Sequence, residues 1–299
     1  MATGVNDYQL LPIFLISLVV LLSATEFGRW LGTRVSDQGA DEVLTLQGAV
    51  LDLLALMIAF TFAMALSRFE GRRDAVLNEA NAIGTTALRA RLLPEPHNTE
   101  TLKLLREYVQ VRLDITQRVP TPEEFSAAVS HSSEIQEALW QQAKAMAAKD
   151  NGIVPTGLFI QSLNELIDDQ EKRLTALRNR VPNVVLLALY GVAAIAGAFS
   201  GYAGGLSKRS SRLPMYVMIF LIAAVILLIQ DLDRPSTGFI TTSQQPMIDT
   251  AAAIARTLSE VSISTGASPV FPLWVFPISV YILRESTRQP SRHPIKRSA

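Results

Sequence analysis

The side chains that could carry out chemistry are few in this sequence and lie far apart. Cysteine is absent, which excludes disulfides, iron–sulfur clusters, zinc thiolates and cysteine nucleophiles. The histidines His97, His131 and His293 have no partner at the spacing of a metal site. Because no pairing of a nucleophile with a base is visible either, the sequence predicts no enzyme, no cofactor and no bound metal.

A first cluster of charged residues comprises Asp231, Asp233 and Arg234, followed by Pro235, which ends a helix. Two carboxylates and one guanidinium at this spacing are compatible with a cation site or with an ion-pair latch onto basic residues of another helix. The latch is the more ordinary interpretation, since a divalent cation requires more oxygen ligands than these side chains supply.

A second cluster comprises Arg72, Arg73, Glu79 and Asn81 within one predicted helix. These residues could line a water-filled vestibule or form hydrogen bonds between helices. Both interpretations require that the helix extend from a membrane into water.

Both clusters adjoin long apolar segments that are predicted to cross a membrane. Hydrophobic residues make up 49% of the chain and are concentrated in four segments, 10–24, 46–66, 184–206 and 213–232. The last three have about the 20 residues that a helix needs to cross a bilayer. The first lacks the basic residues that precede the apolar part of a signal peptide. Lys and Arg (27) balance Asp and Glu (27), so no excess of positive charge predicts binding to nucleic acid.

The spans form two pairs that flank a long polar region. No Gly-Pro break separates the second span from the polar helix that follows it, so one continuous rod should leave the membrane. The predicted fold class is an all-α membrane protein with four transmembrane helices in two pairs and a helical cytosolic bundle. The predicted parts are a transmembrane hairpin (1–66), a soluble helical bundle (67–182), a second transmembrane hairpin (183–235) and a C-terminal region (236–299) with an amphipathic helix, a short apolar segment at 269–283 and a disordered tail.

Charge counts leave the orientation of the spans open. Basic residues in the short links between paired spans favour a cytoplasmic location of the links, whereas those flanking the central region favour a cytoplasmic bundle. The arginines that directly follow the second span support the latter. We therefore expect a protein of the bacterial inner membrane, with both termini and the central bundle in the cytoplasm.

Asp52 is the only ionisable residue inside a predicted span and away from its ends. A charge there costs a few kcal/mol and usually faces a cavity or a partner. Asp52 could therefore form a ring that attracts cations at a pore mouth, or it could pair with Arg29 or Arg34.

Gly197, Gly201 and Gly205 recur every fourth residue in the third span. Small residues on one face let two helix backbones approach closely, so these glycines predict a packing face. The partner helix could belong to the same chain or to another subunit.

Two strings of residues carry a resemblance to a known family. EANAIGT, within the long segment 54–96, and DLDRP, directly after the fourth span, are similar to the bacterial bestrophin-like membrane domain family. The resemblance covers roughly residues 8–262. The family has no known function of its own, and its name reflects a distant likeness to bestrophins, which are pentameric ion channels.

The resemblance implies five copies around a pore that is lined by the second span. The candidate neck residues are Leu54 or Leu51, Ile58 and Phe62, with Thr61 beside them, because stacked apolar rings can close a pore by dewetting. These side chains could equally pack against neighbouring helices of the same chain.

The sequence therefore favours a homo-oligomeric ion channel whose partners are the lipid bilayer, further copies of the chain and small inorganic ions. The alternative is a non-conducting membrane sensor or scaffold whose soluble bundle binds a partner protein.

Overall fold

The computed structural model describes residues 10–35, 40–117, 121–149, 153–207, 211–235 and 238–264, and this part of the chain is helical and contains no strand. The all-α fold class with four membrane-length helices is therefore confirmed. In chain order the elements are α1 (Leu10–Gly32), α2 (Ala40–Ala90), α3 (His97–Gln117), α4 (Pro122–Lys149), a π-helical turn (Ile153–Gly157), α5 (Leu158–Arg178), α6 (Asn183–Leu206), α7 (Leu213–Asp233) and α8 (Gln245–Ser264).

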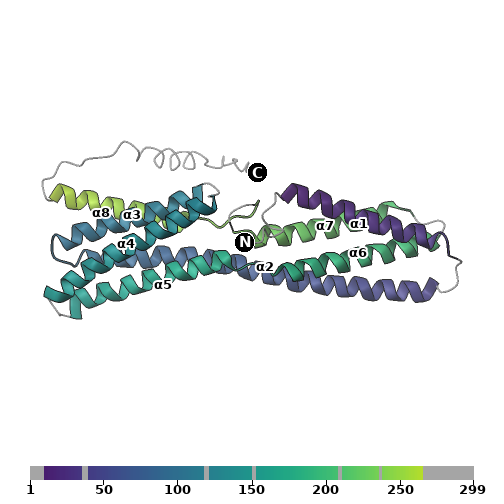
Figure 1. Ribbon diagram of the computed structural model, residues 1–299, viewed down its shortest axis with the longest axis horizontal. Helices are drawn as coiled ribbons and strands as arrows, with labels where there is room; N and C mark the ends of the chain where they lie inside the picture. The colour runs from purple at the N-terminus through teal and green to yellow at the C-terminus, as the bar shows by residue number, and fades with distance from the viewer. Residues whose placement is uncertain are drawn as a thin grey trace, which may run out of the picture. The chain divides into compact units, whose positions relative to one another are not determined.

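Contacts divide the chain into a first unit, residues 1–254, and a second unit, residues 255–299. Within the first unit, α1, α6, α7 and the N-terminal part of α2 form one bundle, while α3, α4, α5 and the rest of α2 form another (Figure 1). The 51-residue helix α2 belongs to both bundles, as the uninterrupted apolar-to-polar segment predicts. The division of the chain into four parts stays a prediction, and the segment 269–283 lies outside the described residues.

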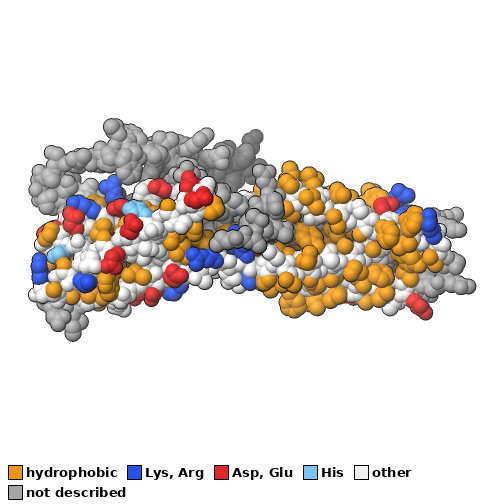
Figure 2. Space-filling model, in the orientation of Figure 1, with side chains coloured by type: hydrophobic (Ala, Val, Ile, Leu, Met, Phe, Trp, Pro, Cys, Tyr) orange, Lys and Arg blue, Asp and Glu red, His pale blue; other side chains and the backbone are white. Residues whose placement is uncertain are grey.

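The bundle of α1, α2, α6 and α7 is apolar on its outside as well as inside. Figure 2 shows a nearly continuous hydrophobic surface over this part of the first unit, with charged side chains at its two ends. Large exposed residues include Ile16 (64%), Phe60 (66%) and Leu187 (74%). Such a surface is stable against lipid and unfavourable in water, so these four helices are the membrane-crossing part of the chain.

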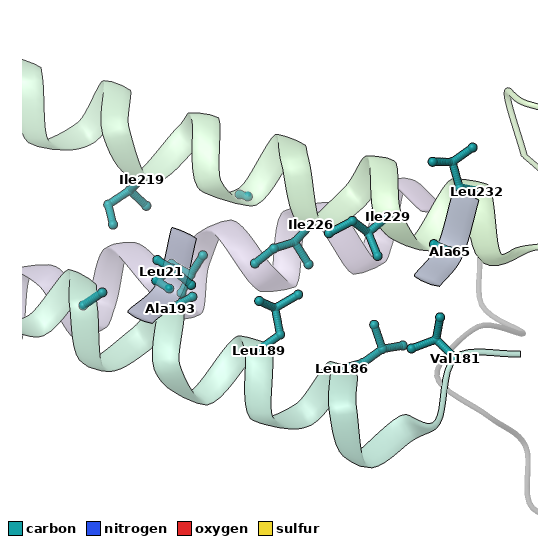
Figure 3. Packing of buried hydrophobic residues seen from close by; sticks show 13 residues of the cluster. Leu21, Ala65, Val181, Leu186, Leu189, Ala193, Ile219, Ile226, Ile229 and Leu232 are labelled. Atoms are coloured by element: carbon teal, nitrogen blue, oxygen red, sulfur yellow. The ribbon is translucent and has the colours of Figure 1, made fainter. Parts of the chain in front are cut away.

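The core of the membrane bundle is made of interlocking aliphatic side chains. Leu21, Leu189, Ala193, Ile219 and Ile226 come from three helices, are at most 1% exposed and lie in one cluster (Figure 3). Because lipid tails are as apolar as these side chains, close packing rather than exclusion of water holds the bundle together.

The glycine row of α6 lies against α1 of the same chain. A Cβ atom at Gly201 would overlap the carbonyl oxygen of Thr25, and one at Gly205 would overlap that of Arg29. A Cβ at Gly197 would lie 2.8 Å from Oγ1 of Thr25. The structure thus places all three glycines at a contact within the chain, and at Gly201 and Gly205 only hydrogen fits.

In the polar bundle, local signals set the helix boundaries. The N–H of Thr121 donates to Oε2 of Glu124 at 2.9 Å, and the N–H of Glu124 donates to Oγ1 of Thr121 at 3.2 Å. This reciprocal capping box begins α4, with Pro122 at the position where a missing N–H costs nothing. Helix α8 contacts α2 where the hydroxyl of Thr250 donates to the carbonyl of Ala80 at 3.3 Å.

Candidate functional site: the uncovered stripe of α2 and the arginine junction

Two of the predicted neck residues face the interior of their own subunit. Leu54 and Thr61 are each 2% exposed, and the hydroxyl of Thr61 donates to the carbonyl of Met57 in its own helix. A residue that lines a path between subunits must be uncovered in the single chain. Both residues therefore lie on a covered face of α2, and Leu54 belongs to the core cluster that α6 and α7 share, while their role in a neck stays a prediction.

Ile58 and Phe62 are partly buried and pack against the same core. They lie at the border between the covered and uncovered faces of α2. Their role in a neck stays a prediction, and the packing interpretation accounts for the contacts that the structure shows.

The opposite face of α2 is exposed along its length. We call it the uncovered stripe, and its residues recur every three or four positions, the spacing of one face of a helix. It consists of Ala49, Asp52, Leu56, Ala59, Ala63, Ser67, Glu70 and Asp74. Small, apolar and acidic side chains thus form a single line that no other described helix of the chain covers.

Asp52 lies on this stripe, one helical turn from Leu56, which is 53% exposed. Within the single subunit this carboxylate faces outward at membrane depth. Arg73 and Asn81 are also exposed on α2, farther along in the polar bundle.

Glu79, in contrast, is completely buried at the centre of the polar bundle. Its Oε2 lies 2.6 Å from Nη1 of Arg173 in α5, and its Oε1 lies 3.0 Å from Nε of Arg112 in α3. The hydroxyl of Tyr108 in α3 donates to Oε1 at 2.7 Å. One carboxylate therefore joins α2 to two other helices, which is the contact between helices that was one of its two predicted roles.

The charges of this cluster are strongly coupled. Burial alone would raise the pKa of Glu79, but the guanidinium groups of Arg112 and Arg173, with hydrogen bonds from Arg173 and Tyr108, bring it below its ordinary value. Burial and the negative charge of Glu79 raise the pKa of Tyr108 well above its ordinary value. Glu79 is therefore ionised, Tyr108 is neutral, and one arginine charge is in excess.

The sequence did not identify Arg112, Tyr108 or Arg173, although each interrupts an apolar helical stripe. Tyr108 follows Leu105 by three residues in α3, and Arg112 follows Tyr108 by four. A polar side chain on an otherwise apolar helix face is expected to be buried against a hydrogen-bonding or charged partner. This interruption of the apolar pattern could have located the cluster from the sequence.

Residues 231–234 form a junction between the two bundles of the first unit. The carboxylate of Asp231 accepts the N–H groups of Phe239 (2.9 Å) and Ile240 (3.0 Å), and that of Asp233 accepts the N–H of Val181 (2.8 Å). The guanidinium of Arg72 donates through Nη2 to the carbonyl of Leu232. Both carboxylates thus hold backbone amides, and Arg234 is buried beside them. Among the described residues no group of three or more His, Asp or Glu could hold a metal ion.

An all-helical chain with four membrane-length helices, an apolar outer surface and a buried polar junction is an integral membrane protein. A family model of the Bestrophin-like domain matches residues 14–247. The chain belongs to the bestrophin-like family.

Solved structures agree with this assignment at the level of the fold. A crystal structure of a bacterial bestrophin homologue from Klebsiella pneumoniae is 15% identical, with a TM-score of 0.58 over 87% of this chain and 100% of that chain. A tryptophan-to-alanine variant of a bacterial bestrophin homologue from the same organism is also 15% identical, with a TM-score of 0.59 over 85% of this chain and 98% of that chain. No curated protein matches the sequence.

Proposed function

We propose that this chain is the subunit of a homo-oligomeric ion channel whose path is lined by the uncovered stripe of α2. The observation that carries the proposal is the placement of Asp52 on the uncovered face of a membrane-crossing helix. A carboxylate in contact with lipid at that depth costs about 2.5–3.5 kcal/mol on insertion scales. A water-filled axis between subunits removes most of this cost. Membership of the bestrophin-like family supports a channel over an enzyme.

Copies of the chain around an axis convert each stripe position into a ring. Leu56 supplies an apolar ring that can exclude water when the path is narrow. Ala59 and Ala63 follow on the same face, where short side chains leave the path open. In this arrangement the constriction is at Leu56, two residues from the buried Leu54. Five is the number of copies that the likeness to bestrophins implies.

The ionisable residues of the stripe are all acidic. Asp52 precedes the Leu56 ring, while Glu70 and Asp74 follow on the polar side of α2. Rings of carboxylates attract cations and repel anions. The proposed permeant ions are therefore small cations, with the polar bundle and both termini on the cytoplasmic side of the bacterial inner membrane.

Asp52→Asn should lower the preference of the channel for K⁺ over Cl⁻ by roughly threefold or more, because it removes one negative charge from every subunit at the path. The permeability ratio is measured from the reversal potential of purified protein in planar bilayers under a KCl gradient. Glu123→Gln, which removes an exposed charge from the first turn of α4, should leave the ratio unchanged. An unaltered ratio in a conducting Asp52→Asn channel would remove Asp52 from the path.

A further inference from the structure

A cavity of about 550 Å³ opens in the first unit, between the polar bundle and the segment that leads from α7 to α8. Its walls come from α2, α3, α4, α5, Arg180, Pro235 and residues 241–244. This volume is within the range of sites that bind small organic molecules. The cavity is separate from the uncovered stripe, since none of the stripe residues lines it.

The lining is strongly basic. Five of the lining side chains are arginines, and no aspartate or glutamate lines the cavity among the described residues. They are Arg72, Arg112, Arg173, Arg178 and Arg180. Hydroxyl groups of the segment 241–243 lie on the same wall. Figure 2 shows a concentration of basic side chains at the boundary between the apolar and the polar surface of the first unit.

Carboxylates outside the lining, Glu79 near Arg112 and Arg173 and Asp233 near Arg72 and Arg180, leave part of this hydrogen-bonding capacity unused. Glu79 forms ion pairs with Arg112 and Arg173. Arg72 is 2% exposed and donates through Nη2 to the carbonyl of Leu232, but its Nε and Nη1 have no hydrogen-bond partner. Buried guanidinium donors without acceptors are unfavourable, so the wall is suited to a ligand that carries several acceptor oxygens.

The remaining wall is apolar. Val76, Ile115, Phe125 and Leu177 face the same space. A bare inorganic ion would contact only the arginines, whereas a ligand with a phosphate and an organic portion would occupy both walls. Guanidinium groups recognise phosphate through paired N–H donors.

We infer that this cavity binds a phosphate-bearing organic anion, with its phosphate at Arg72, Arg178 and Arg180. Two sources share this chemistry: a soluble organic phosphate, and the headgroup of an anionic phospholipid. The second is accessible because Arg72 and Arg180 lie close to the ends of two membrane spans. The inference does not depend on ion conduction.

The test uses the full-length protein, delipidated in a neutral detergent. Thermal unfolding is followed while phenyl phosphate or short-chain phosphatidic acid is titrated, and native mass spectrometry detects phospholipid that copurifies from membranes. A ligand that binds only the folded state raises the unfolding temperature. We expect at least one of the two probes to stabilise the wild-type protein.

Arg178→Gln/Arg180→Gln should weaken that binding by about tenfold or more, because it removes two charged donors to phosphate. Arg178 is exposed and Arg180 partly exposed, so the double variant should still fold. Arg91→Gln/Lys144→Gln removes the same charge from exposed sites outside the cavity and should bind as the wild type does.

Binding of phenyl phosphate that the double variant loses identifies a soluble organic phosphate as the ligand class. If only phospholipid binds or copurifies, and the double variant loses it, the ligand is a lipid headgroup. Absence of binding to both probes, or equal binding by the wild type and the Arg178→Gln/Arg180→Gln variant, would overturn the inference.

Discussion

Gly201→Leu should abolish the folded membrane bundle. A side chain at this position would meet the backbone of Thr25, and backbone atoms cannot move aside without separating α1 from α6. Overpacking of this kind costs about 3 kcal/mol or more, a large part of the stability of a domain. We expect little or no monodisperse protein when a fluorescent fusion is extracted in mild detergent and analysed by size-exclusion chromatography.

Gly191 provides a matched control in the same helix. Apart from its chain neighbours and the adjacent backbone of its own helix, no heavy atom lies within 4 Å of a Cβ built there, and the residue is exposed. Gly191→Leu should therefore give a normal elution profile. If Gly201→Leu also elutes normally with an unchanged unfolding temperature, the close contact of α1 with α6 is not present in the protein.

Glu79→Gln should lower the free energy of unfolding by about 3–5 kcal/mol, because it leaves two buried guanidinium groups without their carboxylate. Glu79 is 0% exposed, while Arg112 and Arg173 are 2% and 5% exposed, so water cannot replace the lost charge. The effect is measured as a decrease in the thermal unfolding temperature of the purified protein. Glu171→Gln, which removes an exposed carboxylate two residues from Arg173, should change it little.

The same cluster predicts a dependence on pH. Folding lowers the pKa of Glu79, so its contribution to stability is present above the pKa of the unfolded chain and is lost as the pH falls through the lower pKa of the folded state. The free energy of unfolding should therefore fall less on acidification in Glu79→Gln than in the wild type. Identical unfolding temperatures of the two proteins at neutral pH would contradict the assigned ion pairs.

Local signals in the sequence were sufficient to predict where the helices lie. They were not sufficient to predict which face of α2 is buried. The capping box of Thr121 and Glu124 and the unbroken segment that became α2 depend only on neighbouring residues, and both were predictable. The span within α2 is apolar all round, so no periodicity distinguishes the side that packs on α6 and α7 from the side that stays uncovered. Leu54 and Leu56 are chemically identical, and only tertiary packing separates them.

The charged cluster was unpredictable for a different reason. Arg112 and Arg173 are 33 and 94 residues from Glu79 in the sequence. Which arginine approaches which carboxylate depends on how α3 and α5 pack on α2, and spacing within one helix does not contain that information. The sequence indicated a cluster of Asp231 and Asp233. Only the structure shows their backbone partners, which are the N–H groups of residues 239 and 240 for Asp231 and of residue 181 for Asp233.

The most direct test of the proposed ion path uses the absence of cysteine from the chain, which allows single cysteines to be introduced without background. Ala59→Cys and Ala63→Cys lie on the uncovered stripe, and Thr61→Cys lies between them on the buried face. Each purified variant is reconstituted into liposomes, and K⁺ flux is recorded before and after a cationic, water-soluble methanethiosulfonate, which requires a hydrated thiolate. If the path follows the stripe, the reagent should block K⁺ flux through the variants at positions 59 and 63 and leave flux through the variant at position 61 unchanged. Flux that continues unchanged at 59 and 63, or no flux in the unmodified protein, would contradict the proposed channel and favour the non-conducting sensor or scaffold.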